Sequence, residues 1–188
     1  MSLRSALRAQ TADCHAAVDT LFGSFNLSRP QDYKAFLRAH AQVVPSVEHA
    51  LEQAGIARLL NDWPERRRAH LLAADIRALD DRLPPLLPQP ALHCDAAVWG
   101  AAYVLEGSRL GGALLAKAIP DHLPSSYLSP QGPKSAMRLF MDRLDGSNVD
   151  DPAAAITAAR DVFDLFLNAG QLTLEAAPME AVPTEAVQ

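Results

Sequence analysis

The apolar residues of this chain recur at three- and four-residue intervals, and prolines and isolated glycines separate one such stretch from the next. That spacing places apolar side chains along one side of an α-helix. Alanine, the strongest helix former, is abundant, whereas sequences typical of β-hairpin turns are almost absent. The pattern therefore predicts an all-α fold.

The breaks divide the chain into six expected helices, at about 3–22, 28–54, 62–79, 95–119, 133–144 and 151–174. Capping boxes at Ser28 and Asp62 predict where two of them begin, and Pro45 should kink the second helix. Four prolines within Leu83–Pro90 predict an extended connector. We expect one domain over residues 1–174 and a disordered tail over 175–188.

Composition excludes several classes of protein. The chain has 188 residues, of which 49% are hydrophobic and 21% charged, as in ordinary globular proteins. A net charge of −5 argues against a nucleic-acid partner. We find no membrane-spanning stretch, signal-peptide core or disulfide framework, and no apolar surface stripe is left over after folding. We therefore expect a cytoplasmic monomer with no membrane partner.

Common catalytic motifs are missing as well. The sequence has no dinucleotide-binding Gly-x-Gly-x-x-Gly, no phosphate loop, no Gly-x-Ser-x-Gly and no His-Glu-x-x-His. Glutamate is never followed three residues later by histidine, as a di-iron bundle would require.

His15 is a candidate haem ligand on the first helix. It lies at the edge of the apolar stripe, with Thr11 one turn before it and Asp19 one turn after it. Asp19 could orient the imidazole, and Arg8, roughly 10 Å away along the helix, could reach a haem propionate. Taken alone, His15 is better explained as a half-buried histidine that hydrogen-bonds to Thr11 or Asp19, because a single histidine at a helix edge is common.

Three glycines, Gly107, Gly111 and Gly112, lie close together in the middle of the fourth helix. Each costs about 1 kcal/mol relative to alanine, so about 3 kcal/mol of helix propensity is given up. Gly107 and Gly111 are four residues apart and share one face. That bare face fits either close helix packing or a flat ligand pressed against the backbone. Combined with His15, it suggests haem sandwiched between two helices.

These two segments resemble the haem oxygenase family. Leu7-Arg8-x-x-Thr11-x-x-x-His15 resembles its proximal-helix signature, and Tyr103-Val-Leu-Glu-Gly107-Ser-x-Leu-Gly111-Gly112 resembles its distal-helix signature in the bacterial, phytochrome-associated form. The order of helices agrees up to the tail. The resemblance implies a single-domain helical bundle with haem between the proximal and distal helices.

The resemblance also implies roles for individual residues. His15 is the expected iron ligand, flanked by Thr11 and Asp19, and Arg8 is expected to pair with a haem propionate. Asp19 is shorter than the glutamate that the family often has there, and we expect it to reach His15 only through water.

On the distal side, the implied contacts are Tyr103, Gly107, Gly111 and Gly112, with Gly107, Ser108 and Gly111 at the catalytic face. Ser108 stands where animal-type members carry an aspartate, and its hydroxyl can order water. The remaining candidates for haem contact are Phe163 and Phe166 on the last helix, and Arg138 and Lys134 for the second propionate. Core packing explains the two phenylalanines about equally well, and a solvated charged face explains either basic residue taken alone.

The implied reaction is oxidative cleavage of b-type haem by O₂ and external electrons, which yields biliverdin, CO and ferrous iron. The implied partners are a ferredoxin or flavodoxin with its reductase, and a bacteriophytochrome that receives biliverdin. A haem carrier or sensor of the same fold without turnover is the main alternative. A thiaminase-like hydrolase would need a nucleophilic cysteine, whereas Cys14 is predicted to point into the core. A structural adaptor would not explain the glycines.

Overall fold

The structure, a computed structural model, describes residues 2–129, 133 and 135–176. Within these residues the chain forms helices and no strand, which confirms the all-α prediction. The α-helices are α1 (Leu3–Gln10), α2 (Ala12–Phe22), α3 (Pro30–Gln53), α4 (Trp63–Arg66), α5 (Ala69–Ala78), α6 (Asp95–Leu115), α7 (Ala136–Asp145) and α8 (Pro152–Ala176), with short 3₁₀ turns η1 (Ile56–Arg58) and η2 (Ala116–Ala118). Lys134 and residues 177–188 of the expected tail lie outside the described residues.

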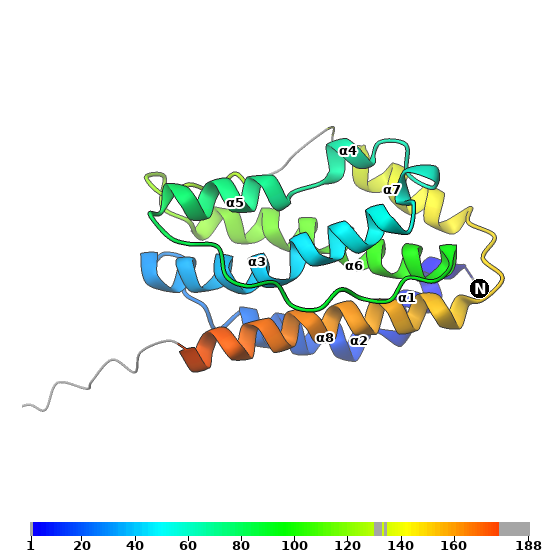
Figure 1. Ribbon diagram of the computed structural model, residues 1–188, viewed down its shortest axis with the longest axis horizontal. Coiled ribbons are helices and arrows are strands. Elements are labelled where there is room, and N and C mark those ends of the chain that lie inside the picture. Colours follow the sequence, from blue (N-terminus) through cyan, green and yellow to red (C-terminus); the bar gives the residue numbers. More distant parts are fainter. Residues whose placement is uncertain (1, 130–132, 134, 177–188) are drawn as a thin grey trace, which may run out of the picture.

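The bundle is organised around α8. This helix packs against α6 and α3 on one side and against α2 and α1 on the other. Figure 1 shows α8 along the lower edge of the bundle beside α2, with α3 and α6 above it and α5 at the upper edge, beyond α3 and α6. Fully buried side chains on α1, α3, α5, α6 and α8 show that the core extends through these layers: Leu7, Leu37, Leu72, Ala101 and Val162. The two helices expected to hold haem, α2 and α6, are thus both fixed by α8.

Two of the predicted helices are broken in the structure. The first is interrupted at Thr11, which has φ −123° and ψ 11° and whose hydroxyl donates to the Leu7 carbonyl at 2.8 Å. The third ends with α4 and restarts as α5, because the buried Glu48 carboxylate accepts the backbone N–H groups of Arg68 and Ala69. A long-range contact therefore starts α5.

The predicted capping boxes are wrong. The Ser28 hydroxyl donates to Asn26 instead of capping α3, and Pro30 begins that helix. Asp62 does stand directly before α4, as predicted, but its side chain makes no capping hydrogen bond and its carboxylate pairs with Arg66 and Arg143 instead. The partner of Ser28 is thus a local one, whereas Asp62 is also engaged by Arg143 of the distant α7.

Other boundaries agree more closely with the prediction. Pro45 lies inside α3, and Figure 1 shows that helix changing direction between its blue and cyan halves. Residues 82–93 form no helix, as the prolines predicted, and they run along the surface of the bundle from α5 to α6 (Figure 1). The fourth predicted helix corresponds to α6, which is followed by the 3₁₀ turn η2 before Pro120. The helix α7 begins at Ala136, three residues later than predicted.

Candidate functional site

His15 lies in the first turns of α2, because the break at Thr11 starts a new helix four residues earlier. Its side chain is 62% exposed, and Nδ1 lies 2.9 Å from the Asp19 carboxylate. The predicted link through water is therefore wrong: the carboxylate contacts the imidazole directly. The Thr11 hydroxyl, by contrast, is buried and bonds to Leu7 instead of His15.

The orientation of this imidazole suits a metal ligand. A carboxylate at Nδ1 favours the tautomer with its proton on Nδ1, which leaves the Nε2 lone pair available. Among the described residues, no group pairs with Nε2 of His15, and none of them forms a cluster of three or more metal-binding side chains. One histidine is enough for haem, because the porphyrin supplies the other four ligands of the iron.

Of the two phenylalanines predicted to contact haem, Phe163 and Phe166, only Phe163 lies beside His15. The Phe163 ring meets the imidazole edge-on, with 6.0 Å between the ring centroids. Phe166 lies one turn farther along α8 and packs in the core. Its ring centroid is 6.4 Å from that of Phe22 and 5.4 Å from that of His40. The structure thus brings Phe163, but not Phe166, into contact with His15.

The glycines of α6 have two different environments. A Cβ atom added at Gly107 or Gly111 would meet nothing within 4 Å, so this face of the helix is open. A Cβ at Gly112 would lie 3.2 Å from the Leu128 side chain, so packing accounts for this third glycine. Close helix packing, the alternative explanation, occurs elsewhere: at Gly100 a Cβ would lie 1.9 Å from the Ala155 carbonyl oxygen of α8.

Apolar side chains extend the open face of α6. Leu110 and Leu114 are 57% and 68% exposed. At 100° per residue, both lie within about 60° of Gly107 around the helix. Bare backbone flanked by exposed leucines is a surface suited to a flat apolar ligand. Burial of these leucines by such a ligand would offset part of the helix propensity that is lost at the glycines.

The two described basic residues predicted to bind the haem propionates, Arg8 and Arg138, lie on different helices. Arg8 is exposed on α1, and its charge and that of Arg4 act on the half-buried Tyr103 of α6. Burial raises the pKa of the Tyr103 hydroxyl, and these arginines partly oppose that shift. Arg138 is exposed on α7 and has no ion-pair partner among the described residues. Arg8 is thus close enough to α6 for its charge to act on Tyr103, and nothing in the described contacts links Arg138 to His15.

Ser108 faces an arginine that the sequence did not single out. Nη2 of the buried Arg68 donates to Ser108 Oγ at 2.6 Å and to the Leu105 carbonyl at 2.9 Å. Ser108 Oγ in turn donates to Leu105 at 2.7 Å. The Arg68 guanidinium also lies 5.0 Å above the ring of Tyr127. Arg68 is the last of three consecutive arginines, and nothing in the sequence distinguishes it as one whose side chain points into the protein.

A second buried network stabilises the same stretch of α6. Glu106 accepts from Arg66 Nη1 at 2.7 Å and from Arg109 Nε at 2.8 Å. Arg66 also donates to Asp62 at 2.7 Å, its carbonyl accepts from Arg109, and its Nε has no partner among the described residues. Burial lowers the pKa of Arg109, and the nearby Glu106 carboxylate opposes that shift. These ion pairs hold the polar side of α6 and leave its glycine face free.

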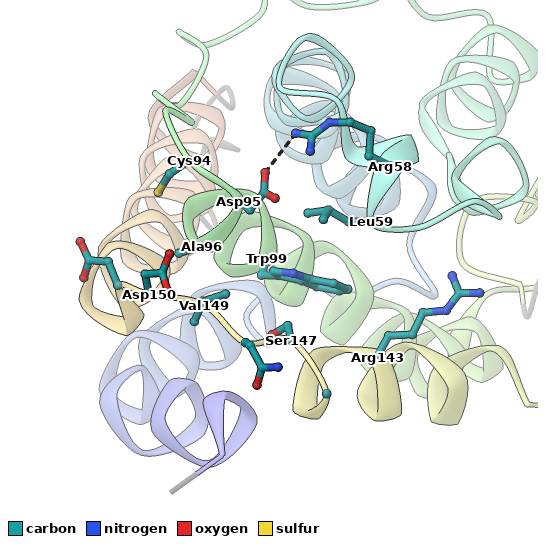
Figure 2. A pocket seen from close by; sticks show the side chains of 13 residues that line it. Arg58, Leu59, Cys94, Asp95, Ala96, Trp99, Arg143, Ser147, Val149 and Asp150 are labelled. Atoms are coloured by element: carbon teal, nitrogen blue, oxygen red, sulfur yellow. Dashed lines mark hydrogen bonds and ion pairs between the residues drawn. The ribbon is translucent and has the colours of Figure 1, made fainter.

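Two surface pockets lie away from these residues. One, of about 630 Å³, lies between the start of α6 and the loop before α8, above Trp99 and beside the Arg58–Asp95 ion pair (Figure 2). The other, of about 720 Å³, is lined by Phe25, Arg38 and Leu174. Neither is lined by His15 or by the glycines of the open face of α6. No helix in the described ranges has the length and apolar character needed to span a bilayer.

Comparison with known proteins supports the resemblance. A haem oxygenase of Xanthomonas campestris is 34% identical over 92 residues, which are 49% of this chain and 55% of that protein; the match thus spans about half of its length. No protein-family model matches the chain.

Solved structures agree over the whole fold. The NO- and CO-bound haem oxygenase of Neisseria meningitidis superposes with a TM-score of 0.82 at 22% identity over 100% of both chains. The haem oxygenase of Leptospira interrogans superposes with a TM-score of 0.72 at 20% identity, covering 92% of this chain and 100% of its own. The chain therefore has the fold of the bacterial haem oxygenases.

Proposed function

We propose that this protein is a haem oxygenase, which cleaves b-type haem with O₂ and external electrons to biliverdin, CO and ferrous iron. The observation that supports this most strongly is that the chain carries both an exposed His15 imidazole and an open face of α6 at Gly107 and Gly111. An accessible imidazole held by Asp19 and a helix face that no side chain fills are the two surfaces a haem sandwich requires.

The residues of the site fit haem. His15 Nε2 would bind the iron, Phe163 would contact the ring edge, and the open face of α6 would cover the opposite side. Arg8 would pair with one propionate, and Arg138 is the candidate for the second. Bound haem supplies the redox-active iron and the porphyrin that is oxidised.

The protein would contribute position and hydrogen bonds on the α6 side. Because the Ser108 hydroxyl donates to Leu105 and accepts from Arg68, its proton is already committed and one lone pair remains. Ser108 can therefore hold a water molecule as an acceptor, with that water's second proton pointing elsewhere. In this arrangement Arg68 is a positioning residue, and the bare backbone at Gly107 leaves room for the water.

The proposal includes partners. The electrons would come from a ferredoxin or a flavodoxin with its reductase, and a bacteriophytochrome would receive the biliverdin. We propose that the protein works as a monomer in the cytoplasm.

Titration of the protein with hemin, followed by ascorbate or a ferredoxin system under air, tests the proposal. We expect a one-to-one Soret complex that decays as the broad red absorption of biliverdin grows. His15→Ala should lose this band or regain it only with added imidazole, whereas His70→Ala, at an exposed position of α5, should behave as wild type. A Soret complex that survives both reductants would indicate a haem carrier or sensor and would contradict the proposal.

A further inference from the structure

The connector between α5 and α6 has a regular pattern of exposure. From residue 81 to residue 90, every third residue (Asp81, Pro84, Leu87 and Pro90) is partly buried, and the residues between them are exposed. A period of three is that of the polyproline II helix, which has three residues per turn and no internal hydrogen bonds. This segment, here called the proline strap (residues 81–90), therefore lies on the bundle with one of its three faces.

The sequence of the strap enforces this conformation. Pro84, Pro85, Pro88 and Pro90 each fix φ near −65°, and the residue before each proline is held out of the α region. Most of the strap's backbone freedom is thus removed before it meets any partner. Polyproline segments are recognised for this reason, because little conformational entropy is lost when they bind.

The strap is attached to α3 by its inner face. The Leu87 N–H donates to the Gln42 carbonyl at 2.8 Å, and the Ser46 hydroxyl donates to the Leu87 carbonyl at 2.8 Å. At the strap's start, Arg38 donates to the Asp81 carboxylate at 3.0 Å and to the Arg82 carbonyl at 2.9 Å. These contacts fix which faces point away from the bundle.

The two outer faces carry the features of a recognition motif. One presents Arg82, Pro85 and Pro88 at intervals of three, and the other presents Leu83 and Leu86, which are 47% and 56% exposed. The guanidinium of Arg82 has no partner among the described residues. Prolines three apart beside a free cation match a groove lined with aromatic side chains that has an acidic group at one end.

From this geometry we infer that the proline strap is a docking surface for a protein domain with an aromatic, acid-flanked groove that reads Arg82, Pro85 and Pro88. The inference does not depend on the proposed haem chemistry, because none of these residues belongs to the candidate haem site. The small area of a strap predicts weak, transient binding.

An NMR titration tests the inference, with an isotope-labelled SH3 domain whose proline groove has an acidic neighbour as the probe and the full chain as the ligand. We expect saturable shifts at the aromatic residues of the groove. Replacing Pro85→Ala and Pro88→Ala together should weaken binding at least about tenfold, as expected when anchor residues are truncated. Gln89→Ala, an exposed change on the other outer face, should leave the dissociation constant unchanged.

A second variant keeps the test valid if the double proline change disturbs the fold. Arg82→Glu is exposed and leaves the strap's backbone bonds in place, so it should weaken binding while the melting temperature stays that of the wild type. Its effect should shrink at high salt, because the proposed pairing is a surface contact. Absence of saturable shifts, or shifts that neither variant weakens, would overturn the inference.

Discussion

The Asp19 carboxylate lies 2.9 Å from Nδ1 of His15, one turn farther along α2. Both side chains are more than half exposed, so the pair adds little to the stability of the fold. Its consequence is orientation, because the carboxylate sets the imidazole tautomer and directs Nε2 outward.

Replacing Asp19 should therefore affect ligand binding far more than folding. For Asp19→Ala we expect haem affinity to fall about 10- to 100-fold, the usual cost of losing a partner of a ligating histidine. Hemin titration measures the affinity, and urea denaturation should show an unchanged free energy of unfolding. Asp161→Ala, which removes an exposed carboxylate of α8, is the control. Equal affinities for the two variants would contradict the orienting role.

Substitutions at Gly107 and Gly100 should have opposite effects on the apoprotein. Gly107→Ala adds a Cβ that meets nothing and gains helix propensity, so the free energy of unfolding should rise by about 1 kcal/mol. Gly100→Ala forces a Cβ against the Ala155 carbonyl and should cost about 1–3 kcal/mol. Urea denaturation without haem measures both.

A larger residue at Gly107 should separate folding from function. Gly107→Leu should leave the apoprotein folded but abolish one-to-one hemin binding, because its side chain would occupy the face assigned to haem. Normal hemin binding by this variant would show that haem does not lie against Gly107.

Loss of the buried carboxylate of Glu106 should be costly. It is 1% exposed and neutralises Arg66 and Arg109, so Glu106→Gln should lower the free energy of unfolding by about 3–5 kcal/mol. Asp95→Asn breaks the exposed 3.0 Å pair with Arg58 and should cost less than about 1 kcal/mol. Similar costs for the two changes, measured by thermal or urea unfolding, would argue against a dry ion-pair network beside α6.

Acid should destabilise the protein through His40. This imidazole is buried among Phe36, Tyr127 and Phe166, and desolvation lowers its pKa from 6.5 to about 4. The unfolded chain binds the proton first, so the stabilisation is complete above pH 6.5 and declines as the pH falls towards 4. The full loss corresponds to about 3 kcal/mol.

The variant His40→Gln isolates this contribution. It should show a shallower fall in the free energy of unfolding between pH 6.5 and 4 than the wild type, whereas His70→Ala should keep the wild-type slope. Parallel curves for wild type and His40→Gln would contradict the assignment.

Local sequence determined much of this protein. The period of the apolar residues set the helices, and the prolines set the extended strap, because both act on the backbone within a few residues. The sequence also placed Gly107 and Gly111 on one face of a helix and put His15 and Asp19 one turn apart. These relationships follow from helix geometry alone.

Tertiary structure decided which groups meet across helices. Glu48 starts α5, Arg68 turns inward to Ser108, and Asp62 pairs with Arg143 of α7 instead of capping its own helix. Side-chain oxygens and guanidinium groups bond to whatever partner burial brings near them, so local sequence rules cannot choose among such partners. Likewise, only packing could show that Gly100 is a close helix contact while Gly107 is open, because the same residue type serves both and the difference lies in what the neighbouring helix places opposite it.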